Sequence, residues 1–592
     1  MKENSDKPLK TQRKWKLAEV AGLLFAVFST LALTLHAATV FWWGPDDGAY
    51  AFVAERILRG DILNKDIQDV HPGYINFVNA GAMAVLGENA FSLRIPLIFL
   101  AALQCIFAFL ALRNLGAVAA SAAAIAVGYF GFAQFPNPSA NWYALAFVWP
   151  ILFAFRMTGV TEFQRLLLFG FLVGSAFLFR QLTGVFLGAA VFTILMLNAP
   201  AKNEDAASPL LANVVFGIAF VGIGTYLFFS SNMAGFLMYG AGSLAVLGVA
   251  AAKTRLEFRE VVRVAGALTL GSLVPAAPLI LFHFFNGSFE MWITDAFIAP
   301  LTLVSYDFFD TASYGILPIL AGMGVAEGSA SAFFNLIYWI LMMVAPMALG
   351  AIAARRIWRD QNDELTPIII LAVFVGLVSV HYEIPIYLYY SAGMIWVGLI
   401  ASTNTKFRTP VSIVTISVAF IAAFFHAGQP STRGLVSIAH GERVAQEAYA
   451  IPGAAINIDA NQADLYLSAM DLVANCSNPE DTIFSMPSAA EFYFLTKRQP
   501  PVRYFSTALG LHNKEDAEAL EAVFLSDRRP SVVFDQKADK YNSEFLDGVR
   551  KQLRGAEYAS SGARRGVNAY IVNYRTTDAG CANSMVIWNI DE

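Results

Sequence analysis

The chain has 592 residues, of which 57% are hydrophobic and only 14% are charged, with a formal net charge of −5. Soluble proteins are about 45–50% apolar even when glycine is counted, so this composition indicates a polytopic membrane protein. The chain carries no basic tract of the kind that follows nucleic acid, which excludes that class of partner.

Apolar runs of roughly 20 residues predict membrane spans, and residues 18–43 form the first of them. A basic tail precedes this run, but the run is long and more spans follow, so we expect an uncleaved helix and not a signal peptide. By the same criterion we predict about thirteen spans in all. The others cover 94–112, 116–135, 141–155, 166–180, 184–199, 210–230, 232–252, 263–285, 333–353, 366–381, 384–402 and 409–427.

Basic residues predict the orientation of these spans, because short loops rich in Lys and Arg stay in the cytoplasm. The tail 1–17 is basic, and alternate loops after it hold the remaining basic clusters. These are Arg113, Arg156 and Arg165, Lys202, Lys253 to Arg263, Arg355 to Arg359, and Lys406 with Arg408. We therefore expect a cytoplasmic tail, a membrane domain at 18–429 and a location in a bacterial inner membrane. Outer regions then follow at 44–93, 286–332 and 430–592.

The C-terminal region 430–592 is too polar for the bilayer and long enough to form a domain. A stretch at 463–475 has helical periodicity, and four short apolar runs resemble strands. The runs are 481–486, 531–535, 569–574 and 585–589. Strands interleaved with helices predict a small extracytoplasmic α/β domain. Cys476 and Cys581 lie within it and could pair in an oxidising compartment, although spacing alone leaves that pairing open.

The first outer loop opens with two adjacent carboxylates, Asp46 and Asp47, where the first span ends. Residues 49–59 place apolar side chains at helical spacing and predict a short amphipathic helix in the membrane interface. Residues 74–87 are apolar but short, which suits a re-entrant or interfacial helix. One aspartate can cap a helix. Adjacent residues do not share a helix face, so the other can point into a cavity.

The stretch "DDGAYAFVAERILRGDILNKDIQDVHPGYINFV" at 46–78 resembles the GT-C superfamily of membrane glycosyltransferases. The shared features are the acidic pair after a span, an aromatic residue soon after it, an A-x-x-I-L-x-G-D helix and a His-Pro step. The likeness is closest to the branch of protein O-mannosyltransferases and lipid A aminoarabinose transferases. The match continues at 91–104, and weaker matches lie at 177–188 and 479–505.

This resemblance implies an enzyme that moves a sugar from a polyprenyl-phosphate carrier to a lipid, glycan or protein acceptor at the outer face. It aligns Asp46 with the family's catalytic carboxylate and puts Asp47 where many members have glutamate. We expect Asp46 to act as general base and the displacement to invert the anomeric carbon. Asp47 could orient the acceptor, cap the helix or hold a divalent cation. No other cofactor is predicted.

Phosphate needs a cation at the outer membrane surface, and Arg180 is the first candidate because it lies at the outer end of a span. An ionisable residue near membrane depth is a functional candidate, although Arg180 could also snorkel to lipid headgroups. Gln181 and His71 are weaker candidates for donor binding. Further candidates for the cavity are Arg94, which could instead pair with Glu88, and the polar break of His381, Tyr382 and Glu383.

Two other classes of protein compete with the enzyme. A transporter or lipid flippase would also have many spans, but should carry charges deep within several of them or in paired halves. In this chain the charges lie at span ends and no internal repeat is evident. A non-catalytic partner with the same fold is the other alternative, and an intact acidic pair argues against it.

Overall fold

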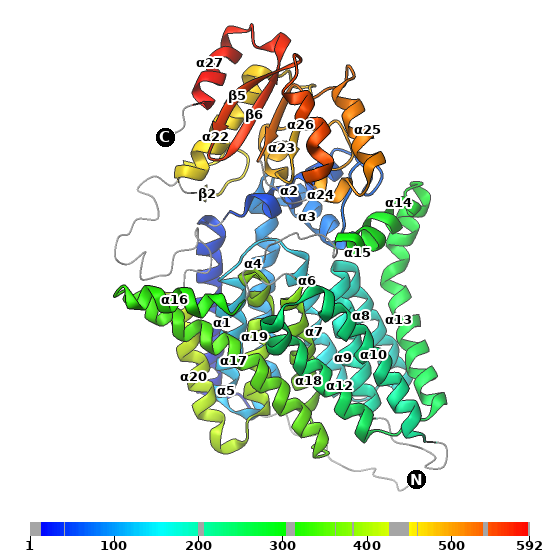
Figure 1. The fold of residues 1–592 in the computed structure, drawn as a ribbon. Helices are drawn as coiled ribbons and strands as arrows, with labels where there is room; N and C mark the ends of the chain where they lie inside the picture. The colour runs from blue at the N-terminus through cyan, green and yellow to red at the C-terminus, as the bar shows by residue number, and fades with distance from the viewer. Residues whose placement is uncertain are drawn as a thin grey trace.

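The computed structural model describes residues 14–40, 42–198, 207–303, 314–361, 363–381, 384–424, 449–458, 460–536 and 543–589. Long helices form a bundle, and the C-terminal residues form an α/β unit that caps one end of it (Figure 1). The short helices α2 (Gly44–Leu58) and α3 (Tyr74–Leu86) lie between the bundle and this unit.

Nine helical segments among the described residues are long and apolar enough to cross a membrane, which supports an integral, multi-pass protein. They are α1 (Leu17–Val40), the segment Ala90–Leu115 that contains α4 (Arg94–Leu112), α8 (Glu162–Phe179), α9 (Gln181–Asn198), α10 (Pro209–Ser230), the segment Met233–Lys253 that contains α12 (Ala241–Lys253), α13 (Phe258–Phe285), α17 (Ala330–Trp358) and α20 (Thr405–Phe424).

The other four predicted spans are shorter or broken helices, so the predicted count is not confirmed. The run at 116–135 ends early, because the chain passes into a π-helical turn and then a proline-containing loop. The run at 141–155 is divided between two helices. These four regions contain α5 (Ala117–Val127), η3 (Gly128–Phe132), α6 (Ala140–Ala146), α7 (Val148–Arg156), α18 (Thr366–Val375), η6 (Gly376–Val380) and α19 (Pro385–Ser402).

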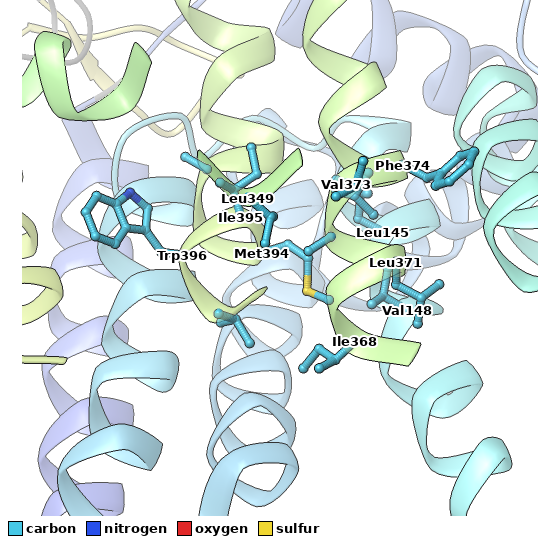
Figure 2. Close-up of a cluster of buried hydrophobic side chains, with 14 of the residues drawn as sticks. Leu145, Val148, Leu349, Ile368, Leu371, Val373, Phe374, Met394, Ile395 and Trp396 are labelled. Atoms are coloured by element: carbon cyan, nitrogen blue, oxygen red, sulfur yellow. The ribbon is translucent and has the colours of Figure 1, made fainter. Parts of the chain in front are cut away.

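Helix α18 explains why a short apolar helix can belong to the bundle. Every one of its residues is buried, as expected for a helix that is hydrophobic all round and lies among other helices. Figure 2 shows its side chains gathered with those of α17 and α19 and with Leu145 and Val148. Where α19 crosses α5, a Cβ on Gly393 would lie 2.7 Å from the Cα of Val127, so the crossing requires glycine.

The region after α13 contains short helices at the capped end of the bundle (Figure 1). These are α14 (Phe289–Ile293), η5 (Thr294–Ile298), α15 (Ala299–Leu303) and α16 (Ile316–Ala326). None of the residues of α16 is buried, although the helix is strongly apolar. Smaller turns adjoin the spans at η1 (Ala90–Leu93), η2 (Arg113–Leu115), α11 (Met233–Gly235) and η4 (Phe236–Gly240).

The C-terminal unit contains a four-stranded sheet in the order β3-β4-β6-β5. Strand β3 is parallel to β4, and the other neighbours are antiparallel. The strands are β3 (Ile483–Met486), β4 (Val532–Asp535), β5 (Tyr558–Arg564) and β6 (Val567–Val572), and a separate pair is formed by β1 (Tyr449–Ala450) and β2 (Asn457–Ile458). The helices are α22 (Ala460–Cys476), α23 (Ala490–Thr496), α24 (Thr507–Gly510), α25 (Lys514–Phe524), η7 (Ser543–Leu546), α26 (Asp547–Leu553), η8 (Asn573–Arg575) and α27 (Ala579–Trp588).

The predicted small sheet is confirmed, with two differences. The run at 585–589 was predicted as a strand, and that prediction is wrong because residues up to Trp588 belong to α27. A short apolar run has no periodicity that separates a buried strand from a buried helix, and here the Trp588 ring packs 5.5 Å from that of Phe534. Strand β5 was not predicted, because its sequence YASSGAR is polar and weakly alternating.

Cys476 at the end of α22 and Cys581 in α27 form a disulfide across a sequence separation of 105 residues. A crosslink that closes so long a loop restricts the unfolded chain. We expect the double replacement Cys476→Ser and Cys581→Ser to lower the unfolding free energy by about 2–4 kcal/mol. Thermal unfolding of the full chain in detergent would measure this loss. The control is Cys105→Ser, which removes a buried free thiol and leaves the disulfide intact. Equal melting temperatures for wild type and the double variant would contradict the prediction.

Candidate active site

Both aspartates lie within the first turn of α2, which begins at Gly44. Proline at the second position favours this start, because its fixed φ suits a first turn. The helix was predicted from residue 49, but it begins at Gly44. Its location at the membrane interface stays a prediction. Helix α2 is buried on nearly all sides between α3 and α23. The sequence of the loop could not show this, because α23 comes from the distant C-terminal unit.

Asp47 is turned toward the bundle and is 2% exposed. One of its carboxylate oxygens accepts a hydrogen bond from the backbone N–H of Trp43 at 2.8 Å and another from the Arg94 guanidinium at 2.9 Å. Arg94 is fully buried and also donates to the carbonyl oxygen of Ala38 at 2.5 Å. The sequence left Arg94 open between a role in the cavity and a pair with Glu88, and in the structure it pairs with the carboxylate of Asp47, while Glu88 is exposed. The Asp47–Arg94 pair instead joins α1, α2 and α4.

Asp46 is turned toward a different set of side chains. It is partly buried, and its Oδ2 atom accepts a hydrogen bond from the side-chain amide of Asn137 at 3.4 Å. Burial and the adjacent charge of Asp47 raise the pKa of Asp46 to about 6, while His71 and Arg180 oppose this rise. A carboxylate with this pKa is ionised at neutral pH and is a stronger base than an ordinary aspartate.

His71 lies between α2 and the arginine of the site. Its Nδ1 atom and its backbone N–H both contact Asp69 Oδ1 at 2.6 Å. A carboxylate at Nδ1 favours the tautomer that carries a proton there. The Nε2 atom is then an acceptor, 3.5 Å from the Tyr50 hydroxyl and 3.4 Å from Arg180 Nη1. The predicted candidate His71 is therefore part of the same cluster as Asp46 and Arg180.

Arg180 occupies the junction between spans α8 and α9, where the backbone is extended with φ −149°. The chain thus turns back at this residue, and its guanidinium reaches the Tyr387 hydroxyl at 3.4 Å as well as His71. Arg180 is partly exposed. A charged group at the end of two spans can contact water and an anionic headgroup without entering hydrocarbon.

The remaining predicted residues are positioned differently. The side-chain nitrogen of Gln181 donates to the carbonyl oxygens of Val70 at 2.8 Å and Ala296 at 2.6 Å, so it connects two loops. The ring of His381 lies 5.5 Å from that of Tyr387, which places His381 beside the arginine end of the site. Tyr382 and Glu383 are outside the described residues.

Three residues of the cluster were not predicted from the sequence: Asn137, Tyr387 and Tyr390. Asn137 is fully buried, donates to Asp46 and accepts from the Tyr390 hydroxyl at 3.3 Å. It lies in the segment QFPNPS at 134–139, between two apolar runs. A polar, proline-rich break at the end of a span was the available signal, since irregular backbone at membrane depth is tolerated where it lines a cavity.

A second polar network joins the C-terminal unit to the loops around the site. Asp295 in η5 is 1% exposed and accepts two hydrogen bonds from Arg503, at 2.6 and 2.9 Å. It also accepts one from the Gln68 side chain at 3.0 Å. A bidentate arginine–carboxylate pair is geometrically specific, so this network holds the first loop, η5 and the C-terminal unit in one arrangement.

Metal ligation was left open by the sequence. Among the residues that the structure describes, no group of three His, Cys, Asp or Glu side chains converges in a way that could hold a metal ion. Asp47, the nearest carboxylate to Asp46 in the chain, already contacts Arg94. A divalent cation stays a prediction.

No protein family model matches this chain, and no curated protein matches it. Two solved structures of ArnT from Cupriavidus metallidurans align with it over most of their length, at 11% sequence identity each. The apo form covers 93% of this chain and 98% of its own, with a TM-score of 0.37. The form bound to undecaprenyl phosphate covers 93% and 96%, with a TM-score of 0.35.

Proposed function

We propose that this protein is a membrane glycosyltransferase that moves a sugar from a polyprenyl-phosphate carrier to a lipid, glycan or protein acceptor. The observation that carries the proposal is the presence of a candidate base and a cation in one site. Asp46 and Arg180 lie in the same polar cluster, at the end of a bundle of membrane spans. The sequence resemblance of residues 46–78 to the GT-C superfamily supports the same conclusion.

The positions of Asp46 and Arg180 suit a single displacement that inverts the configuration of the anomeric carbon. The acceptor hydroxyl loses its proton to the Asp46 carboxylate as its oxygen forms a bond to the anomeric carbon. The bond between that carbon and the phosphate oxygen breaks at the same time, and the electron pair leaves with the phosphate. Arg180 offsets the negative charge that the departing phosphate gains, because guanidinium can bind phosphate through two parallel N–H groups. Asn137 orients Asp46.

We place this site on the extracytoplasmic face. Several basic clusters lie at the end of the bundle away from the C-terminal unit, where α12 meets α13, α19 meets α20 and α17 ends (Figure 1). They are Lys253, Arg255 and Arg259, then Arg355, Arg356 and Arg359, and lastly Lys406 and Arg408. Positive residues are retained in the cytoplasm, which puts Asp46, Arg180 and the domain at 430–592 outside.

The charges within the spans favour the enzyme over a transporter. In the described part of the nine long helices, the Asp, Glu, Lys and Arg residues lie toward the helix ends. Glu19 and Arg94, which are fully buried, are both in first turns and pair with Arg113 and Asp47. A transport pathway would need ionisable groups near the middle of the spans.

The test uses full-length protein in lipid nanodiscs with a panel of polyprenyl-phosphate sugars and envelope acceptors. We expect release of polyprenyl phosphate together with a glycosylated acceptor. The same panel in sealed vesicles tests the alternative. Movement of an intact labelled lipid between leaflets, without release of polyprenyl phosphate, would contradict the proposal and indicate a flippase.

Arg180→Ala is expected to raise the KM for the donor by roughly 10- to 100-fold, because a charge-assisted hydrogen bond is worth about 1.5–3 kcal/mol. Arg180→Lys keeps the charge but loses the planar fork, so we expect an intermediate value. Initial rates at varied donor concentration measure both effects. The matched control is Arg259→Ala, an exposed arginine in the first turn of α13. A donor KM for Arg180→Ala equal to that of the control would exclude the phosphate role.

A further inference from the structure

Helix α23 of the C-terminal unit packs directly on the turn of α2 that carries Asp46. Gly44 and Gly48 are four residues apart on α2 and so share one face. A Cβ on Gly48 would lie 2.4 Å from the Cα of Glu491, and one on Gly44 would lie 2.4 Å from the Tyr466 hydroxyl. A larger side chain at Gly48 would meet the backbone of α23 and separate the two helices, and one at Gly44 would displace the Tyr466 and Glu491 side chains. The two glycines therefore allow the C-terminal unit to contact the backbone of the active-site turn.

Glu491 is the charged residue of this contact, and it is buried with 3% of its surface exposed. Its Oε1 atom accepts a hydrogen bond from the Tyr466 hydroxyl at 3.5 Å, and its Oε2 atom is buried with no hydrogen-bond partner among the described residues. No described lysine or arginine forms an ion pair with it. An ionised carboxylate buried without a cation is strongly disfavoured.

The groups around Glu491 supply no positive charge. They are Tyr466 on α22, Asp46 on α2 and Tyr493 on α23 itself, and none of them is a cation. Burial and, to a smaller extent, the negative charge of Asp46 raise the pKa of Glu491 to about 8, while the backbone N–H of Glu491 itself and the bond from Tyr466 oppose this rise. A second negative charge here would repel Asp46 and weaken the contact between α2 and α23.

We propose that Glu491 is a positioning residue of the active site, which as a neutral carboxylic acid holds the first turn of α2, and with it Asp46, against the C-terminal unit. The effect of Glu491 on catalysis rests on the proposed function, because it requires that Asp46 is the general base. The contact itself does not depend on that function. The C-terminal unit is then a part of the active site and not only a neighbour of it.

Glu491→Gln tests the contact between α2 and α23 independently of catalysis, because glutamine has the same length as glutamate and stays neutral at every pH. A group whose folded pKa is raised stabilises the fold at low pH and loses that contribution as pH rises. For Glu491 the loss occurs between its ordinary pKa of 4.5 and about 8. We expect the melting temperature of wild type, relative to that of Glu491→Gln, to fall across this window in detergent. Parallel curves for the two proteins would overturn the proposal. Glu515→Gln, which alters an exposed glutamate of α25, is the matched control.

The kinetic test uses the pH profile of donor cleavage. We expect wild-type kcat to decline above about pH 8 as Glu491 ionises, with the KM for the donor nearly unchanged, and Glu491→Gln to lack this decline. Tyr466→Phe is the second variant, for the case that Glu491→Gln folds poorly. It removes the hydrogen bond that lowers the pKa of Glu491, so the decline should move to higher pH. An alkaline limb unchanged by both substitutions would overturn the positioning role.

Failure of the proposed function gives a different pattern. Donor cleavage would then be absent, or independent of Asp46, while the melting curves of wild type and Glu491→Gln would still diverge with pH. If the role of Glu491 is wrong but the proposed function is right, donor cleavage depends on Asp46, and the melting curves of wild type and Glu491→Gln run parallel with pH.

Discussion

Asp46→Asn is expected to reduce sugar transfer by about 10²- to 10⁴-fold, the range that a positioned general base contributes. Asparagine has the same shape and can still accept the hydrogen bond from Asn137, so the loss would come from the missing base and not from a displaced helix. Release of labelled polyprenyl phosphate over time measures it. A rate equal to that of wild type would remove Asp46 from the mechanism.

The pH profile provides a second measurement of the same residue. Because the base must be unprotonated and its pKa is about 6, we expect kcat/KM to fall about tenfold per pH unit below that value. The contribution of Asp46 to the unfolding free energy changes with pH in the opposite direction to the rate, and falls as the pH rises. A raised pKa means that the fold is stabilised by protonation of Asp46, and that this contribution is lost between 3.8 and about 6. Asp46→Asn should therefore be no less stable than wild type at pH 7. A rate that is flat from pH 5 to 7 would contradict the base role.

Arg94→Met is expected to destabilise the fold more than any of the other substitutions, with a loss of about 3–5 kcal/mol. The change leaves Asp47 as a buried carboxylate without a cation, since Arg94 donates to it at 2.9 Å from a fully buried position. Denaturant unfolding of the full chain in detergent measures the loss. The effect would be on stability, in contrast to Asp46→Asn, although the two aspartates are adjacent.

A double-mutant cycle tests directly whether the loss comes from the unpaired Asp47 carboxylate. Removing both members of a buried pair is often far less harmful than removing one, so Arg94→Met combined with Asp47→Asn should recover much of the loss. Glu88→Gln is the control, because that exposed glutamate was the alternative partner that the sequence offered for Arg94. Strictly additive losses from Arg94→Met and Asp47→Asn would show that the two residues do not interact.

The long spans were predictable because hydrocarbon requires continuous apolar helices of a minimum length. The predictions at 18–43, 263–285 and 333–353 all correspond to long helices, α1, α13 and α17. The prediction at 366–381 is not confirmed as a span, because α18 in the interior of the bundle is apolar on every side but only 10 residues long before the chain continues as η6. A helix surrounded by other helices need not match the bilayer, so its length and position depend on its neighbours.

The site was predictable in part. Asp46, His71 and Arg180 were named from the sequence. In the structure Arg180 contacts His71, and both residues lie close enough to Asp46 to lower the pKa of its carboxyl group. Gln181 was named as a donor ligand, but its amide nitrogen is bonded to two backbone carbonyls. Asn137 and Glu491 were missed because neither lies near Asp46 in the chain, and each acts through a contact between distant segments.

The sequence by itself determined that this chain spans a membrane many times, that it carries a polar C-terminal unit with a small sheet, and that an acidic pair follows the first span. These properties depend on composition and local periodicity, which any stretch of chain carries with it. Only the tertiary structure decided which aspartate faces the cluster of Arg180, and that Asp47 is paired with Arg94. Adjacent residues on a helix point in different directions, so their roles depend on which distant side chains the fold brings to each face.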